Sequence, residues 1–133
     1  MKIVGFTFKK ISIEKTSDKF KDLKINTKID ILGVKQIKPE IFQPKEELIE
    51  VEFNYIIDYS PDIAKISLSG NVLIMADGKV IKDFIKQWKK KKIPEEHRIL
   101  IFNVILKKSN LKAMQLEDEM NLPLHIPLPS VKE

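Results

Sequence analysis

The sequence predicts an α+β fold: a four-stranded antiparallel sheet followed by two helices packed on one face, with an extended proline-rich C-terminal tail. Before Asp77, apolar and polar side chains alternate at a period of two, which is typical of half-buried strands. From Asp77 onward the apolar residues recur at helical spacing, and three prolines between 121 and 129 exclude a helix there. We therefore expect a single domain over residues 1–133, divided into a sheet at 1–76 with a crossover loop at 36–47, helices at 77–120 and an extended tail at 121–133.

The first strand is expected to contain a bulge. Val4, Phe6 and Phe8 place apolar side chains at even positions, whereas Ile11 and Ile13 place them at odd positions beyond two lysines. Because successive residues of a strand point to opposite faces, an extra residue between the two sets would keep both on the same face.

A second strand and a long crossover follow. Apolar side chains at odd positions alternate with polar ones at Leu23, Ile25, Ile29 and Ile31. This alternation predicts an antiparallel strand with one buried face. The segment 36–47 holds Pro39 and Pro44 on either side of Ile41 and Phe42, and we interpret it as a crossover loop that contains two apolar residues.

The third and fourth strands are predicted to form a hairpin. The third strand has the clearest alternation, with apolar side chains at Ile49, Val51, Phe53, Tyr55, Ile57 and Tyr59. Ser60, Pro61 and Asp62 predict the turn, and residues 64–74 supply the fourth strand. Gly70 lies within this strand, where it weakens packing unless another backbone comes close.

Two helices are predicted after the sheet. Asp77 is the expected N-cap of the first, whose apolar positions are Val80, Ile81, Phe84, Ile85 and Trp88. The lysines at 89–92 suit the negative C-terminal end of that helix, and Pro94 predicts the start of the next. The middle of the second helix, 99–106, is apolar on nearly every side, so the sheet and first helix or a second subunit must cover it.

Some apolar residues lie outside the expected core. In the tail, apolar side chains alternate with proline or histidine at Leu122, Leu124, Ile126 and Leu128. We favour the interpretation that the tail and the crossover loop cover the domain's own core. The alternative is a hydrophobic surface for a partner subunit or an extended client chain.

The composition excludes several classes of protein. The net charge is +5, but Arg98 is the only arginine, and lysine lacks the planar fork that reads guanine edges, so a base-specific DNA reader is disfavoured. The sequence has no cysteine, which excludes disulfides and a thiol nucleophile and fits a reducing cytoplasm. No stretch has the pattern of an export signal or the length of a membrane span. We expect a soluble cytoplasmic protein.

No group of residues predicts catalysis. His97 and His125 are the only histidines and have no carboxylate at ligand spacing, so we expect neither a metal nor a cofactor. His97 could act as a general base, but a solvated position in a first helical turn explains it equally well. The glutamates at 46, 47, 50 and 52 fit a solvated sheet face, and the lysines at 89–92 fit a solvated helix end better than a phosphate contact. We expect a protein that is not an enzyme.

The order of elements resembles that of the SecB family of export chaperones, in which four antiparallel strands and a proline-bearing crossover precede the helices. Three segments are similar to segments of that family: FTFKKISIE at 6–14, ISLSGNVLI at 66–74, and the region from Pro94 to LPLHIPLP at 122–129. The family's Phe-Pro-Tyr-Ala-Arg helix signature is absent, and this chain is basic whereas bacterial members are acidic.

The resemblance implies a homo-oligomer, a dimer or tetramer whose helices pair between subunits, with apolar grooves that bind unfolded or extended polypeptide without catalysis. The candidate client-contact residues, chosen for their expected exposure, are Ile41, Phe42, Tyr55, Trp88, Leu124 and Ile126. The alternative function is a structural or adaptor subunit that docks on one specific protein partner. A non-specific nucleic-acid binder and an enzyme rank below both.

Overall fold

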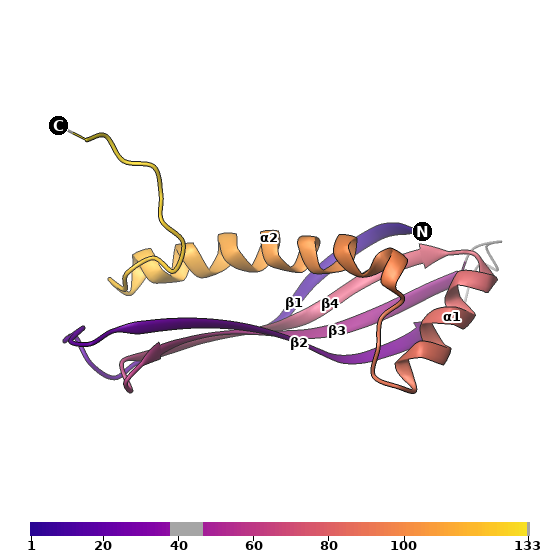
Figure 1. The fold of residues 1–133 in the computed structure, drawn as a ribbon, viewed down its shortest axis with the longest axis horizontal. Coiled ribbons are helices and arrows are strands. Elements are labelled where there is room, and N and C mark those ends of the chain that lie inside the picture. Colours follow the sequence, from indigo (N-terminus) through magenta and orange to yellow (C-terminus); the bar gives the residue numbers. More distant parts are fainter. Residues whose placement is uncertain (38–46, 133) are drawn as a thin grey trace.

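The structure is a computed structural model that describes residues 1–37 and 47–132. Its elements are, in chain order, β1 (Lys2–Lys15), β2 (Lys24–Ile37), β3 (Glu47–Ser60), β4 (Ala64–Ala76), α1 (Gly78–Trp88) and α2 (Glu95–Glu119). The strands pair antiparallel in the order β1-β4-β3-β2, so β1 and β2 are the edge strands. The long twisted sheet lies below α2, and α1 sits at the end of the sheet where α2 begins (Figure 1). The predicted α+β fold, a four-stranded antiparallel sheet followed by two helices, is confirmed.

The two central strands form the core of the sheet. The predicted hairpin of β3 and β4 is confirmed, with Val51 opposite Val72 and Phe53 opposite Gly70. Six side chains of β3 at alternate positions are fully buried: Ile49, Val51, Phe53, Tyr55, Ile57 and Tyr59. These residues define the inner face of the sheet, which the helices cover. Because only this face is buried, apolar and polar residues alternate in the sequence of β3.

The predicted bulge in β1 is confirmed, and it explains Gly70. The register between β1 and β4 shifts between Phe8 and Lys10, so the apolar residues on both sides of the shift face the same way. A Cβ atom added at Gly70 would lie 2.9 Å from the Cα of Phe8 and would also collide with the carbonyl oxygen of Thr7. The backbone of β1 therefore approaches β4 closely at Gly70, the one position of β4 that lacks a side chain.

α1 is capped at both ends in ways that the sequence explains. The side chain of Asp77 accepts a hydrogen bond from the amide of Val80 at 3.0 Å, as predicted for an N-cap. At the other end the amide of Lys92 donates to the carbonyl of Gln87 at 3.1 Å. Lys91 precedes it with a φ of 59°, in the left-handed region, which is the geometry of a Schellman motif. This turn directs the chain from α1 toward α2.

α2 is one continuous helix of 25 residues. Ile101, Ile105 and Ala113 face the sheet and are fully buried. On other sides of the helix, Ile99, Leu100 and Leu111 remain 73%, 49% and 58% exposed. The sheet and α1 thus cover only part of the apolar surface that the sequence predicts for this helix. No helix in the described ranges is long and apolar enough to cross a membrane.

The outer face of the sheet, opposite the helices, is polar at its centre. Lys9 pairs with Glu50 at 3.6 Å and Lys35 pairs with Glu52 at 3.2 Å. Asn71 donates a hydrogen bond to Glu50. Each of these partly exposed ion pairs contributes little to stability. Their positions show that Glu50 and Glu52 lie on the polar face of the sheet, as the sequence indicated.

Candidate functional site

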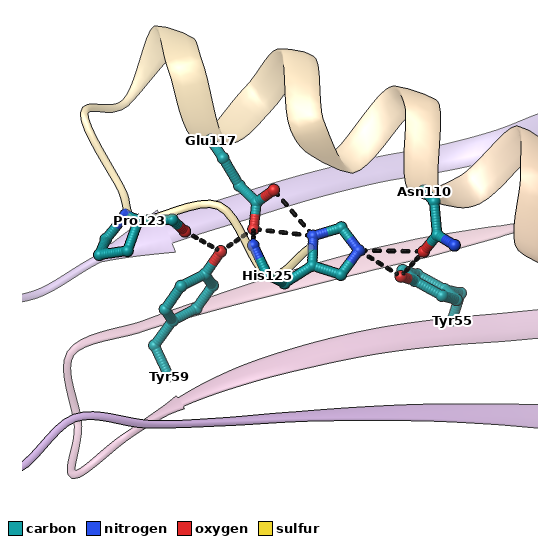
Figure 2. A network of polar contacts seen from close by, with 6 residues as sticks. All are labelled: Tyr55, Tyr59, Asn110, Glu117, Pro123 and His125. Carbon is teal, nitrogen blue, oxygen red and sulfur yellow. Dashed lines mark hydrogen bonds and ion pairs between the residues drawn. The ribbon is translucent and has the colours of Figure 1, made fainter. Parts of the chain in front are cut away.

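The four predicted contact residues that the structure describes lie in two separate regions. Trp88 lies at the end of α1, near the start of α2. Tyr55, Leu124 and Ile126 lie near the C-terminal part of α2, around a buried polar network (Figure 2). Ile41 and Phe42 fall outside the described residues. Two separate regions are therefore candidates for a functional site.

The first region is a buried polar network that fastens the tail to α2. Both oxygens of the Glu117 carboxylate lie within 3.0 Å of Nδ1 of His125, and Oε2 also accepts from the His125 amide at 3.0 Å. The hydroxyl of Tyr59 donates to the same oxygen and lies 3.0 Å from the carbonyl of Pro123. The carboxylate is fully buried and the His125 side chain is 3% exposed. Burial of such a charge is tolerated only because three donors surround it.

The other ring nitrogen of His125 completes the network. Nε2 lies 2.9 Å from Oδ1 of Asn110 and 3.1 Å from the hydroxyl of Tyr55, which itself donates to Asn110 (Figure 2). Because a carboxylate can only accept, Nδ1 donates to Glu117. A charged ring donates at Nε2 to Asn110, whereas a neutral ring accepts at Nε2 only when the Tyr55 hydroxyl directs its one proton to the ring and no longer to Asn110. Nε2 of His125 therefore has a hydrogen-bond partner in both the neutral and the charged form of the ring.

Both tyrosines are held in the protonated form. Burial raises the pKa of Tyr55 to about 12, and the negative charge of Glu117 adds to this effect. The pKa of Tyr59 is also raised, first by burial and then by its hydrogen bond to Glu117. Both hydroxyls therefore remain donors at neutral pH. Because Tyr55 is fully buried, a client could contact it only after the tail had moved away.

The network anchors only the first part of the tail. Leu122 is buried, and Leu124 and Ile126 on either side of His125 are half-buried. Beyond them, Leu128 is 57% exposed and Val131 is fully exposed. Leu122 therefore belongs to the core of the domain, while the end of the described tail extends away from the sheet (Figure 1).

The second region is an open cleft of about 690 Å³ at the other end of α2. It lies between the β2 edge strand, the end of α1, the connection that follows and the first turns of α2. Apolar side chains from all four segments line it: Ile29, Ile31, Trp88, Ile93 and Phe102. Because β2 is the last strand on one side of the sheet among the described residues, the cleft borders an edge of the sheet.

Cationic side chains lie over the aromatic rings of this cleft. The Lys91 ammonium is 4.9 Å from the centre of the Trp88 ring, and the Arg98 guanidinium is 5.8 Å from the centre of the Phe102 ring. Both distances fall within the range of cation–π attraction. Apolar surface and positive charge therefore occur together in the cleft.

Sequence reasoning predicted Tyr55 as a contact residue but missed the network to which it belongs. Asn110 and Glu117 occur seven residues apart in a helix, and Glu117 falls among the buried positions with Ala113 and Leu116. A carboxylate on an apolar helical face is a signal for a buried partner. The partner, His125, could not be identified because the course of the tail does not follow from its sequence.

Both histidines are packed against other side chains. The ring of His97 stacks on Phe84 with the ring centres 5.6 Å apart, so its surroundings are those of a packed side chain. His125 is enclosed by the network. Within residues 1–37 and 47–132, no group of three or more histidine or carboxylate residues is arranged to hold a metal ion.

Comparison with known proteins supports a relationship at the level of the fold. No protein-family model and no curated protein matches the sequence. Among solved structures, the chain is similar to the SecB-like chaperone Rv1957 of Mycobacterium tuberculosis, in complex with a ChAD peptide from the Rv1956 HigA1 antitoxin. The similarity covers 99% of this chain and 91% of that chain, with a TM-score of 0.52 and 10% identity. The chain has the fold of a SecB-like chaperone, and at this identity the likeness concerns the fold alone.

The network predicts a high cost for replacing His125. In the His125→Ala variant, Glu117 loses the ring donor while its carboxylate stays buried, so we expect the free energy of unfolding to fall by about 2–4 kcal/mol. Urea denaturation measures this loss. Leu128→Ala, in the exposed part of the same tail, is the matched control and should change stability by less than about 0.5 kcal/mol. Equal stability of the two variants would contradict the network as an anchor.

The raised tyrosine pKa predicts loss of stability in alkali. Between the ordinary pKa of 10.0 and the folded value of about 12, Tyr55 keeps its proton in the folded state and loses it in the unfolded state. The free energy of unfolding should therefore fall as pH rises above 10, by up to about 1.4 kcal/mol per pH unit from this group. Denaturation curves at pH 9 to 11.5 should show a steeper fall for the wild type than for Tyr55→Phe. Parallel slopes would disprove this contribution.

Proposed function

We propose that this protein is a non-catalytic, chaperone-like binder of unfolded or extended polypeptide, and that the cleft beside β2 holds the bound segment. The observation that carries this proposal is the open cleft of about 690 Å³, which is lined by apolar side chains and borders an edge strand. Clefts that bind peptides combine these two features, because an apolar side chain of the ligand needs a pocket and its backbone needs hydrogen-bond partners.

The edge strand suggests how a bound segment would be held. β2 pairs with β3 on one side, and an extended segment could pair along its other side through main-chain hydrogen bonds. Such bonds do not depend on the sequence of the segment. Selectivity then comes from the side chains that reach Trp88, Ile93 and Phe102. A binder of this kind accepts many clients, each through a few buried apolar residues.

The other candidate contact residues enter the proposal in two ways. Ile41 and Phe42 lie outside the described residues, and we keep them as proposed contacts. Leu124 and Ile126 are half-buried at the opposite end of α2, and we propose them, with Tyr55 beneath, as a second contact area. Contact with Tyr55 would require release of the His125 anchor.

The outer side of α2 supports self-association. Four apolar residues are spaced by four, seven and three positions along it: Leu100, Val104, Leu111 and Met114. This is the spacing of a coiled-coil seam, and Lys107 occupies the remaining seam position. Apolar residues that line up on an exposed helix mark a surface for another protein. We propose that two copies pair through this seam in a homo-oligomer, a dimer or tetramer, in the cytoplasm.

A specific adaptor function is the second candidate. The similar mycobacterial chaperone was solved with a peptide from an antitoxin, so a protein of this fold can engage a segment of one particular partner. An adaptor would bind one protein tightly and unrelated unfolded chains weakly. Measuring affinities for several unrelated extended peptides distinguishes these functions, because a chaperone would bind most of them with similar affinity.

The cleft predicts which aromatic residues are needed for client binding. Replacing Trp88 or Phe102 with serine removes an aromatic contact, and we expect binding of an extended apolar peptide to weaken by about 2 kcal/mol, roughly 30-fold. Suppression of aggregation of denatured citrate synthase should fall in parallel. Phe20→Ser is the control, because Phe20 is also exposed, at 37%, but lies outside the cleft. If all three variants suppress aggregation as well as the wild type, the cleft is not the client site.

The seam predicts the effect of charge on oligomeric state. Leu100→Glu and Leu111→Glu place carboxylates where two helices would pack, so we expect both variants to be folded monomers. Light scattering during size-exclusion chromatography measures the mass, and circular dichroism confirms folding. Leu128→Glu, equally exposed but in the tail, should keep the wild-type mass. A monomeric wild type would refute self-association.

A further inference from the structure

The cleft beside β2 has an excess of positive charge. Its lining includes three cationic side chains, Lys91, Lys92 and Arg98, and two carboxylates, Asp30 and Glu95. Arg98 approaches Glu95 to 3.8 Å, so these two charges largely offset each other. Two lysines then remain against one carboxylate on the walls of an apolar cleft.

The remaining carboxylate already has a partner. Asp30 lies 3.6 Å from the ammonium of Lys28, on the same strand. Within residues 1–37 and 47–132, neither Lys91 nor Lys92 forms an ion pair with a carboxylate. The lysines of the cleft are therefore available to a carboxylate from another molecule, whereas its acidic groups are already paired.

One of these cations starts from a defined backbone position and lies over an aromatic ring. Lys91 occupies the left-handed position of the Schellman motif, and its amide donates to the Trp88 carbonyl at 2.8 Å. Its ammonium lies 4.9 Å from the centre of the Trp88 ring. A client side chain that packs on Trp88 would therefore come close to a positive charge.

We propose that the cleft selects extended segments in which an aspartate or glutamate lies two residues from an apolar or aromatic residue. This inference rests on the proposed function and names the class of client for the same site. In an extended chain, residues two apart point to the same side and are about 7 Å apart. An apolar side chain on Trp88 thus places the acidic side chain beside Lys91. The partner is a polypeptide with alternating apolar and acidic residues.

Neighbouring charges reinforce the selection at longer range. Lys89 and Lys90 precede the cleft lysines in the sequence, and all four are exposed. Such a basic run attracts acidic chains and repels basic ones over about 10 Å at 0.1 M salt. The same field explains why an acidic segment would be preferred over a neutral one with identical apolar residues.

Fluorescence of Trp88 provides a direct test, because it is the only tryptophan in the protein. The probes are three tryptophan-free peptides of one length with leucine and phenylalanine at fixed positions. Aspartate, asparagine or lysine occupies the position two residues from each phenylalanine. We expect the aspartate peptide to bind about 3- to 10-fold more tightly than the asparagine peptide and the lysine peptide to bind most weakly. The preference should decrease as salt is raised.

A matched pair of variants assigns the preference to the cleft. Glycine is favoured at left-handed C-terminal positions, so Lys91→Gly removes the ammonium without backbone strain. We expect the ratio of aspartate to asparagine affinities to fall toward one in this variant. Lys82→Ala removes the same charge from an exposed position of α1 outside the cleft, and it should leave the ratio unchanged.

The possible results separate the two proposals. If the three peptides bind to the wild type with equal affinity, or the lysine peptide binds best, charge selection is wrong while peptide binding stands. If no peptide binds, both the selection and the proposed function are wrong. If Lys82→Ala lowers the ratio as much as Lys91→Gly does, the preference reflects overall charge and the proposed position of the acidic residue is wrong.

Discussion

The apolar face of the sheet is covered by a single layer of helices, and most features of the structure depend on this constraint. Strands of 14 residues extend to about 46 Å, whereas the 25 residues of α2 reach about 37 Å. α1 covers the end of the sheet that α2 leaves open. Where the two helices meet the β2 edge the cover is incomplete, and the cleft lies there. Because no second layer packs on α2 within residues 1–37 and 47–132, its outer apolar residues remain exposed there.

The local features of the fold could be predicted from the sequence. One-sided burial produces the period of two in β3, the change of parity after Phe8 marks the bulge, and Asp77 caps α1. Gly70 was recognisable as a place where another backbone comes close. Some of these features depend on residues that are near one another in the chain. The others depend on the burial or the space around a single residue.

The candidate sites could be predicted only in part, because they depend on contacts between distant segments. Trp88 was identifiable as an aromatic residue near a helix end, but its place in a cleft depends on how the connection after α1 turns at Lys91. Glu117 and His125 are brought together by the return of the tail along α2. Prolines in the tail exclude a helix but do not determine this course.

The buried carboxylate of Glu117 has a consequence for the order of events during protein synthesis. Two of its three donors belong to His125, which the ribosome adds only after the whole of α2. Until that residue emerges, the C-terminal part of α2 would bury a charge that lacks most of its partners, which is strongly unfavourable. The helix can therefore settle on the sheet at this end only after His125 has been added and has left the ribosome. A nascent chain that stops before the tail would keep the inner face of the sheet open to quality-control factors and to aggregation.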